Sequence, residues 1–417
     1  MAEEQIKEKH INYQTKTGLR ITYVQKPQFQ RSYCGIGCKY GSAHLFYIRN
    51  QKEMVLPAGL AHFLEHKLFA MPDGSDAFSG FTAMNATANA YTTTDKTLYF
   101  FTTTDRIWDP LSLLLNMYFT PHFTEEAVEH EKDIICSEIK MYEDKADAAI
   151  VQKLMEALYP DDSLSCPIAG TKQSVLKTTA EDLNNAYETF YHPQNSHLVI
   201  VSKEDPKPIF DQIERLMDSF CFLPIDFQKK QTVLSDHVID SVTIHGKTSQ
   251  TQAWVALRMD SARTVPLFCH LMIGILDCLF SPLAAFYQKL SKQKAFLADI
   301  DYTVVTQEET AYLILSAITN HPKDFIKQVT EKIKTVQIED LDEQILDLYL
   351  KHLKAKQISQ LDSIENLGDE ILSLALEEID YFAEQKQIAL LKTEDFKPYL
   401  SYLHEASIVQ AISYKKS

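Results

Sequence analysis

Long hydrophobic runs are absent from this sequence. Hydrophobic residues make up 45% of its 417 residues, but no stretch approaches the ~20 uninterrupted apolar residues that cross a membrane. The longest candidate, residues 266–280, contains His270 and Asp277 and therefore predicts a buried helix. The first ten residues, MAEEQIKEKH, are charged and polar, unlike a secretory signal or an arginine-rich transit peptide. We therefore expect no membrane partner.

Positive charge and paired cysteines are also scarce. The formal net charge is −16, which argues against nucleic acid or an anionic membrane as a binding partner. The seven cysteines are scattered and odd in number, so there is no disulfide framework and a reducing, cytoplasmic location is predicted. Cys34 and Cys38 can share one face of an element, but no neighbouring Cys or His completes a metal site. We expect both in the core.

What the sequence does contain is a short motif of metal-binding side chains. Residues 62–66 read HFLEH, so His62 and His66 are four positions apart. On a helix these positions lie on one face, and both imidazoles can reach one metal ion. Glu65 projects near the same face and can take a proton from a metal-bound water, as in the inverted form of the H-E-x-x-H zinc-protease motif. The alternative is an amphipathic helix whose histidines fall four apart by chance.

The neighbouring residues predict where this helix begins and ends. Pro57 and Gly59 precede the motif, and proline is favoured in a first helical turn. Residues 71–74 read MPDG, which is a turn signal. The motif is therefore expected on a short helix.

A second helix with candidate ligands is predicted over residues 129–143. Catalytic zinc usually has three protein ligands, so the two histidines need a third. Glu131 and Glu138 lie two helical turns apart and share a face. One can be the third ligand, and the other can orient a histidine or the water. The alternative is that both glutamates belong to a solvated, charged helix face.

Together the two segments resemble the pitrilysin/insulinase family of zinc metallopeptidases, which includes the mitochondrial processing peptidase. Residues 61–69 read AHFLEHKLF, and residues 137–144 read SEIKMYED; both are similar to the family's wording at the motif and at the ligand helix. Within the family, the chain is most similar to the zinc-bearing member of paired peptidase-like proteins of low-GC Gram-positive bacteria. The resemblance implies that His62, His66 and Glu138 bind Zn²⁺, that Glu65 is the catalytic base and that Glu131 supports the site.

A substrate-binding strand is also implied by the resemblance. Residues 85–101 read as two extended runs rich in threonine and aromatic residues. In the family the equivalent Asn-Ala-Tyr strand is a sheet edge beside the zinc, where a substrate peptide pairs mainly through main-chain hydrogen bonds. Asn89, Ala90 and Tyr91 are therefore the candidates for substrate contact. The alternative is an ordinary hairpin of the sheet.

The chain shows signs of an internal duplication. Residues 179–205 and 392–412 both read as an acidic helix start, an amphipathic helix and a strand, although common capping chemistry is an alternative explanation. The resemblance implies an α/β (α+β) fold of two similar halves, each a mixed, mainly antiparallel sheet covered by helices, forming a clamshell. We predict a zinc-bearing catalytic half over residues 1–222, a linker over 223–240, and a second half without the zinc motif over 241–417.

The second half departs from the family in one respect. Active members usually carry an Arg and a Tyr seven positions apart there, whereas the nearest match in this chain has Ser291 and Ala298, with Tyr302 as an alternative nearby. The arginines of this half, Arg258 and Arg263, both come earlier. We therefore predict a paralogous subunit without the zinc motif that completes the enzyme as a heterodimer, with a homodimer as the alternative.

These observations predict a zinc metallopeptidase of the H-x-x-E-H type. Its expected activity is endopeptidase cleavage of short or unfolded peptides, in peptide processing or maturation. One alternative is a non-catalytic or assembly subunit that retains a zinc site, although such subunits usually have a degraded motif. The other is a zinc hydrolase that acts on a non-peptide substrate.

Overall fold

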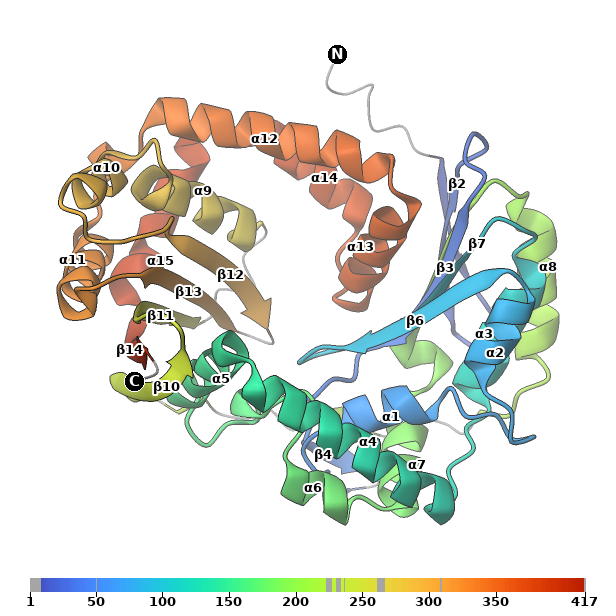
Figure 1. Ribbon diagram of the computed structural model, residues 1–417. Helices are drawn as coiled ribbons and strands as arrows, with labels where there is room; N and C mark the ends of the chain where they lie inside the picture. The colour runs from blue at the N-terminus through green and yellow to red at the C-terminus, as the bar shows by residue number, and fades with distance from the viewer. Residues whose placement is uncertain are drawn as a thin grey trace. The chain divides into compact units, whose positions relative to one another are not determined.

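The computed structural model describes residues 9–49, 51–222, 227–229, 234–235, 237–260, 267–307 and 310–415. The chain divides into two compact units (Figure 1). The first comprises residues 1–139, 166–232 and 357–386, and the second comprises residues 140–165, 233–356 and 387–417. Each unit therefore takes a segment from the other half of the sequence.

The first unit is built on a six-stranded sheet, counted over the described residues, in the order β1-β2-β8-β3-β7-β6. Strands β2 and β8 are parallel and the other neighbours are antiparallel. The central strands β3 and β8 are buried along their whole length. The strands are β1 (His10–Gln14), β2 (Arg20–Gln25), β3 (Ser32–Cys38), β6 (Ala86–Thr92), β7 (Thr97–Thr103) and β8 (Ser196–Ser202). A small sheet in the same unit joins β4 (Phe46–Arg49), β5 (Lys52–Val55) and β9 (Phe227–Lys229).

Helices cover both faces of the first sheet. One face carries the main apolar core of the unit, to which the helices from the first half of the sequence contribute. These are α1 (Leu60–Lys67), α2 (Ala77–Ala83), α3 (Trp108–Phe119), α4 (Glu125–Asp144), α6 (Lys172–Lys177), α7 (Ala180–Phe190) and α8 (Pro206–Met217). The other face packs against α13 (Ile364–Leu376), which comes from far along the chain (Figure 1).

The contact between α13 and the first sheet is close. Leu367, Ile371 and Leu372 pack with residues of β2, β3, β7 and β8 in one buried cluster. A Cβ atom added to Gly368 would lie 2.2 Å from Cδ1 of Tyr33, so only glycine lets the helix approach the strand this closely. The helix is therefore an integral layer of the first unit.

The second unit repeats the strand arrangement of the first. Its five-stranded sheet, as far as the structure describes it, has the order β10-β14-β11-β13-β12, with β10 and β14 parallel and the other pairs antiparallel. This matches β2-β8-β3-β7-β6 strand for strand, in both order and direction. The strands are β10 (Ser241–Thr248), β11 (Gln252–Asp260), β12 (Asp301–Gln307), β13 (Thr310–Ile318) and β14 (Ser407–Lys415). The predicted duplication is thus confirmed at the level of sheet topology.

The helices of the second unit follow the same plan. An apolar core joins one face of the sheet to α9 (Phe268–Phe280), α11 (Pro322–Thr335) and α15 (Leu400–Glu405). On these strands, α5 (Ala146–Leu158) lies against β10, β14 and β11. The remaining α-helices are α10 (Ala285–Lys292) in the second unit, and α12 (Glu343–Leu361) and α14 (Tyr381–Leu390), each of which has residues in both units. Among the described residues no single helix is long and apolar enough to span a membrane, whereas the bent pair α9 and α10 passes the same test by length and composition alone.

Most of the predicted elements are present. Helix α4 covers the predicted segment 129–143, and β6 and β7 are the two extended runs of residues 85–101. The buried helix predicted over 266–280 is α9, which begins at Phe268, and residues 261–266 lie outside the described part of the chain. The boundaries 1–222, 223–240 and 241–417 stay a prediction about the two sequence halves, and much of 223–240 is also outside the described residues.

Candidate metal centre

The helix that carries the motif begins in a constrained turn. Gly59 precedes α1 with φ of 87°, a conformation that L side chains rarely adopt. A Cβ at Gly59 would lie 2.4 Å from the carbonyl oxygen of Ala169, so this position is also too tight for any other residue. The predicted turn at 71–74 is confirmed, since the N–H of Gly74 donates to the carbonyl of Met71. The motif therefore lies on a short helix that is fixed at both ends.

Three candidate ligands converge on one point of the first unit. Nε2 of His62 is 3.6 Å from Oε2 of Glu138, and Nε2 of His66 is 3.5 Å from the same oxygen. Within the described residues, these three form the set whose ligand atoms all lie within 4.8 Å of one another. His62 and His66 come from α1 and Glu138 comes from α4, so two helices supply the set.

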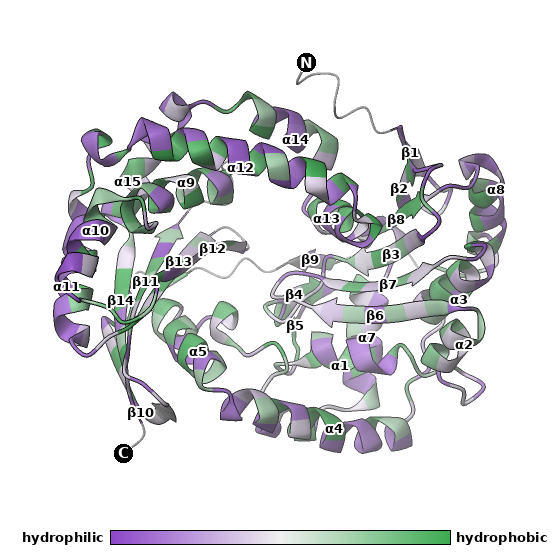
Figure 2. Ribbon diagram, turned by 45° about the horizontal axis from the view of Figure 1, so that its top comes forward, coloured by the Kyte–Doolittle hydropathy of each residue, from purple (hydrophilic) through white to green (hydrophobic). Residues whose placement is uncertain are grey.

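Helix α4 presents its glutamates because its apolar residues fix its orientation. Val128, Ile135 and Ile139 are buried and recur at helical spacing. Figure 2 shows the hydrophilic and hydrophobic residues that alternate along this helix. Burial of that stripe turns Glu131 and Glu138 toward α1 rather than toward solvent. The alternative of a fully solvated glutamate face is therefore excluded for these two residues.

Glu131 holds one histidine in a defined orientation. Its Oε1 lies 3.0 Å from Nδ1 of His66, and its Oε2 lies 3.3 Å from Nζ of Lys67. The contact places the ring proton of His66 on Nδ1, so that Nε2 presents a lone pair toward Glu138. Lys67 is 6% exposed, and its ammonium balances the charge of Glu131 inside the unit.

The pKa values of the two histidines are shifted in opposite directions. Burial, together with the neighbouring His66, lowers the pKa of His62 to about 4. Burial also disfavours the charged form of His66, but the hydrogen bond and charge of Glu131 outweigh it and raise the pKa of His66. Over the described residues, Nδ1 of His62 is buried without a hydrogen-bond partner. A neutral ring at His62 is the form that binds a metal ion.

Glu65 is placed beside the set by a strand residue. The hydroxyl of Thr92, at the end of β6, donates to Oε2 of Glu65 over 2.6 Å. Burial raises the pKa of Glu65, while the hydrogen bond from Thr92 and the charge of His66 act in the opposite direction. A carboxyl group with a raised pKa next to a metal site is suited to accept a proton and release it again.

The predicted substrate strand lies at the edge of the first sheet. Strand β6 ends the strand order and pairs with β7 in the described part of the chain. Of the candidates on it, Asn89 is exposed and Ala90 is half-buried. The hydroxyl of Tyr91 donates to Asp369 of α13 at 3.0 Å. Strand β6 thus ends at Thr92, the residue that is hydrogen-bonded to Glu65.

Three residues around the centre are not indicated by the sequence pattern. Lys67 and Thr92 touch the candidate residues directly, and Asp369 fixes Tyr91. Lys67 follows the motif directly and Thr92 follows the predicted contact Tyr91, so adjacency in the sequence is the available signal for both. Asp369 carries no such signal, because it comes from α13.

The tyrosine and arginine considered as candidates in the second half, Tyr302 and Arg258, have partners within the second unit. The hydroxyl of Tyr302 on β12 donates to Asp277 of α9. Arg258 is 3% exposed, and its guanidinium donates to the carbonyls of Leu158 and Ser235, each at 2.9 Å. Arg263 lies outside the described residues. Arg258 is therefore committed to the interior of its own unit.

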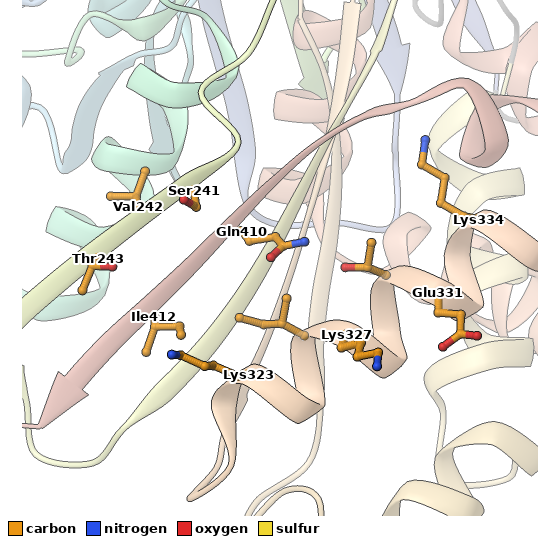
Figure 3. Close-up of a pocket in the computed structure, with 11 residues that line it drawn as sticks. Ser241, Val242, Thr243, Lys323, Lys327, Glu331, Lys334, Gln410 and Ile412 are labelled. Carbon is orange, nitrogen blue, oxygen red and sulfur yellow. The ribbon is translucent and has the colours of Figure 1, made fainter.

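A cavity of about 780 Å³ in the second unit has a different character (Figure 3). It lies between α11 and the strands β10 and β14, and Lys323, Lys327 and Lys334 follow the helix along it. Its described lining contains one acidic residue, Glu331, and no histidine or cysteine. The candidate metal ligands found among the described residues belong to the first unit and do not line this cavity.

Comparison with known proteins places the chain in a family. The model of "Insulinase (Peptidase family M16)" matches residues 20–172, and that of "Peptidase M16 inactive domain" matches residues 177–353. The chain belongs to the insulinase family, peptidase family M16. The first match contains the whole metal centre, and the second begins before the second unit's sheet.

Curated relatives carry zinc-protease names. The chain is 39% identical over 212 residues to "Uncharacterized zinc protease YmfH" of Bacillus subtilis, a match that covers 50% of this chain and 49% of that protein. It is 25% identical over 328 residues to "Putative zinc protease AlbF" of Bacillus subtilis, covering 75% of this chain and 74% of the relative. The match thus spans only about half of YmfH.

Solved structures share the fold over nearly the whole chain. A putative M16-like peptidase from Alicyclobacillus acidocaldarius has a TM-score of 0.90 and 25% identity, covering 99% of both chains. A protease from Helicobacter pylori has a TM-score of 0.79 and 16% identity, covering 98% of this chain and 99% of the other. The predicted fold class, two units of helix-covered mixed sheets, is confirmed.

Proposed function

We propose that this chain is a zinc-dependent endopeptidase that hydrolyses short or unfolded peptides. The observation that carries the proposal is the convergence of Nε2 of His62, Nε2 of His66 and Oε2 of Glu138, with Glu65 alongside. Two imidazoles and one carboxylate are a frequent donor set of catalytic zinc, which keeps a fourth position for water or substrate. Membership of the insulinase family supports the same conclusion.

The residues fit Zn²⁺ by the chemistry of their donors. The lowered pKa of His62 favours its neutral ring, and the Nδ1 of His66 faces Glu131, so that Nε2 of His66 is available as a metal ligand. Zn²⁺ bound by His62, His66 and Glu138 would lower the pKa of a bound water to about 7, as in catalytic zinc sites generally, and would polarise a scissile carbonyl. Glu131 would keep His66 oriented for this role.

Glu65 is the proposed general base. It takes a proton from the attacking water and passes it to the leaving amine, which its raised pKa favours. Thr92 donates to one carboxylate oxygen of Glu65, which leaves the other oxygen for the proposed proton transfer. Lys67 balances Glu131 and thereby limits the negative charge near Glu65.

A peptide is the proposed substrate because of strand β6. An extended chain can pair with this sheet edge through main-chain hydrogen bonds, which tolerate many side chains. Asn89, Ala90 and Tyr91 are the proposed contacts with the peptide. The hydroxyl of Tyr91 donates a hydrogen bond to Asp369. The edge ends at Thr92, so a paired peptide would run past Glu65. Processing or maturation of a short peptide is consistent with this arrangement.

A second chain is the proposed partner. Ser291 and Ala298 stand where active relatives carry Arg and Tyr, and Tyr302 is hydrogen-bonded to Asp277. A paralogous subunit without the zinc motif would supply the missing binding groups. Full peptidase activity of the purified chain as a monomer would refute this part of the proposal. The cytoplasmic location inferred from the cysteines stays a prediction.

The activity itself is tested with a mixed library of short unfolded peptides. We expect cleavage by the zinc-loaded chain, alone or with its paralogue, and loss of cleavage on treatment with a chelator. Cleavage that persists in the chelated protein would contradict the proposal. Hydrolysis of a panel of non-peptide esters and amides, with no cleavage of peptides, would favour the alternative of a non-peptide zinc hydrolase.

A further inference from the structure

A second cavity lies in the first unit, away from β6 in the strand order. It has a volume of about 400 Å³, within the range of small-molecule sites. The strands β1, β2 and β8 form one side, and the end of α13 and the start of α14 form the other. None of the residues assigned to the metal centre lines it.

The strand side brings several polar side chains together by register. Arg20 of β2 pairs with His197 of β8, and Asn12 of β1 pairs with Thr22 of β2. Nε2 of His197 lies 2.9 Å from Oγ1 of Thr22. Because side chains alternate along a strand, Arg20 and Thr22 point to the same face, where His197 meets them.

His197 offers an unused hydrogen-bond acceptor. The hydroxyl of Thr22 donates to Oδ1 of Asn12 at 3.1 Å, so it accepts the proton on Nε2 of His197. That leaves Nδ1 of His197 with a bare lone pair. Within the described residues this atom is buried and has no hydrogen-bond partner, and the whole residue is only 8% exposed. Burial, and to a smaller extent the positive charge of Arg20, lowers the pKa of His197 to about 3. The neutral ring is therefore favoured.

Arg20 offers the complementary group. Its Nε–H is buried and, over the described residues, also lacks a hydrogen-bond partner. A buried donor without a partner is unfavourable, so unpartnered atoms of two residues that line one cavity point to a ligand that would pair with them. A guanidinium binds carboxylates in particular. The site thus presents one donor for an anion and one acceptor for an N–H, side by side.

The opposite wall is apolar, with charge at its rim. Ile371 and Ala375 of α13 and Phe382 of α14 line it. Glu378 and Asp380, in the turn between the two helices, are exposed. An apolar side chain of a ligand can pack on this wall, and an ammonium group can approach the two carboxylates at the rim.

We propose that this cavity binds an α-amino acid unit, as a free amino acid or the C-terminal residue of a dipeptide. Arg20 holds the α-carboxylate, Nδ1 of His197 accepts a hydrogen bond from the nitrogen on the α-carbon, and the wall of Ile371 and Ala375 takes the side chain. In a free amino acid that nitrogen is the ammonium group itself. In a dipeptide it is the amide N–H, and the ammonium group lies one residue further out, toward the rim carboxylates. This binding does not depend on zinc or on catalysis at Glu65.

The test uses the full chain with Glu65→Gln, so that no dipeptide is consumed. Calorimetric titration with L-leucine and with glycyl-L-leucine is expected to show one binding site for at least one of them. Leucinamide, which lacks the carboxylate, is expected to bind at least tenfold more weakly. Stronger binding of the dipeptide would identify a peptide C-terminus as the ligand, and stronger binding of leucine a free amino acid.

Matched variants locate the binding. Arg20→Gln is expected to weaken binding at least tenfold, whereas Arg215→Gln, at an exposed position on α8, is expected to leave it unchanged. His197→Gln, with circular dichroism as the check of folding, is expected to weaken it as well. The proposal is wrong if neither ligand binds the folded protein, if leucinamide binds as tightly as leucine, or if Arg20→Gln binds normally.

Discussion

The role of Glu131 gives the sharpest quantitative prediction. Its carboxylate contacts Nδ1 of His66 at 3.0 Å and Nζ of Lys67 at 3.3 Å, and it does not belong to the converging ligand set. Loss of a residue that orients a metal-binding histidine typically reduces metal affinity about 10–100-fold, which corresponds to about 1.4–2.8 kcal/mol. Glu131→Gln should therefore raise the dissociation constant for Zn²⁺ by that factor.

The same substitution should also affect stability, through a different contact. Lys67 is 6% exposed and would lose the charge that balances it. The glutamine carbonyl can still accept a hydrogen bond from Lys67, so we expect the metal-free protein to lose about 1–3 kcal/mol of unfolding free energy. The double variant Glu131→Gln with Lys67→Met should regain that stability but keep the weakened zinc binding.

Two measurements separate these effects. Zinc affinity is measured by competition with a chelator of known affinity, and stability by denaturant unfolding of the metal-free protein. Glu126→Gln, at an exposed position of the same helix, is the matched control and should change neither quantity. Normal zinc affinity of Glu131→Gln would refute the orienting role. Recovery of zinc affinity in the double variant would show that Glu131 acts through stability instead.

Three further predictions concern other contacts. Thr92→Val removes the hydrogen bond to Glu65 and should reduce peptide turnover about tenfold without loss of zinc; unchanged turnover would contradict the role of Thr92. Burial and two neighbouring carboxylates raise the pKa of Glu384 to about 7. Folding thus favours the protonated form of Glu384. The contribution of this protonation to the unfolding free energy is complete below about pH 4.5 and is lost as the pH rises through 7. Glu384→Gln should therefore stabilise the protein by about 2 kcal/mol at pH 8 and much less at pH 5 in denaturant unfolding; an equal gain at both pH values would contradict the shift. Gly368→Ala should destabilise the first unit by about 1–3 kcal/mol, because its Cβ would collide with the ring of Tyr33, and a neutral effect would be inconsistent with the packing of α13.

The local features of the centre were predictable because they depend on short-range spacing. His62 and His66 are one helical turn apart, and Glu131 and Glu138 are two turns apart on α4, so helix geometry alone places each pair on one face. The approach of the two helices is not contained in that spacing. It follows from apolar burial, for example of Val128 on α4, which a single sequence does not locate in space.

The arrangement of layers was less predictable. The sequence divides into two halves, but α13 packs on the first sheet although it comes from the second half. Its apolar residues are compatible with any buried surface, so their pattern does not identify the sheet that they cover. The cavity at Arg20 and His197 was missed for a related reason, because it depends on the register between β2 and β8. Isolated polar residues in strands carry no signal of that register.

The most direct test of the central claim compares the wild-type chain with Glu65→Gln in zinc content and in cleavage of the peptide library, each protein alone and together with the proposed paralogous subunit. The account predicts one zinc ion in each protein and cleavage only by the wild type, because Glu65 moves the proton but does not bind the metal. Normal cleavage by Glu65→Gln, or absence of zinc from the wild type, would contradict it.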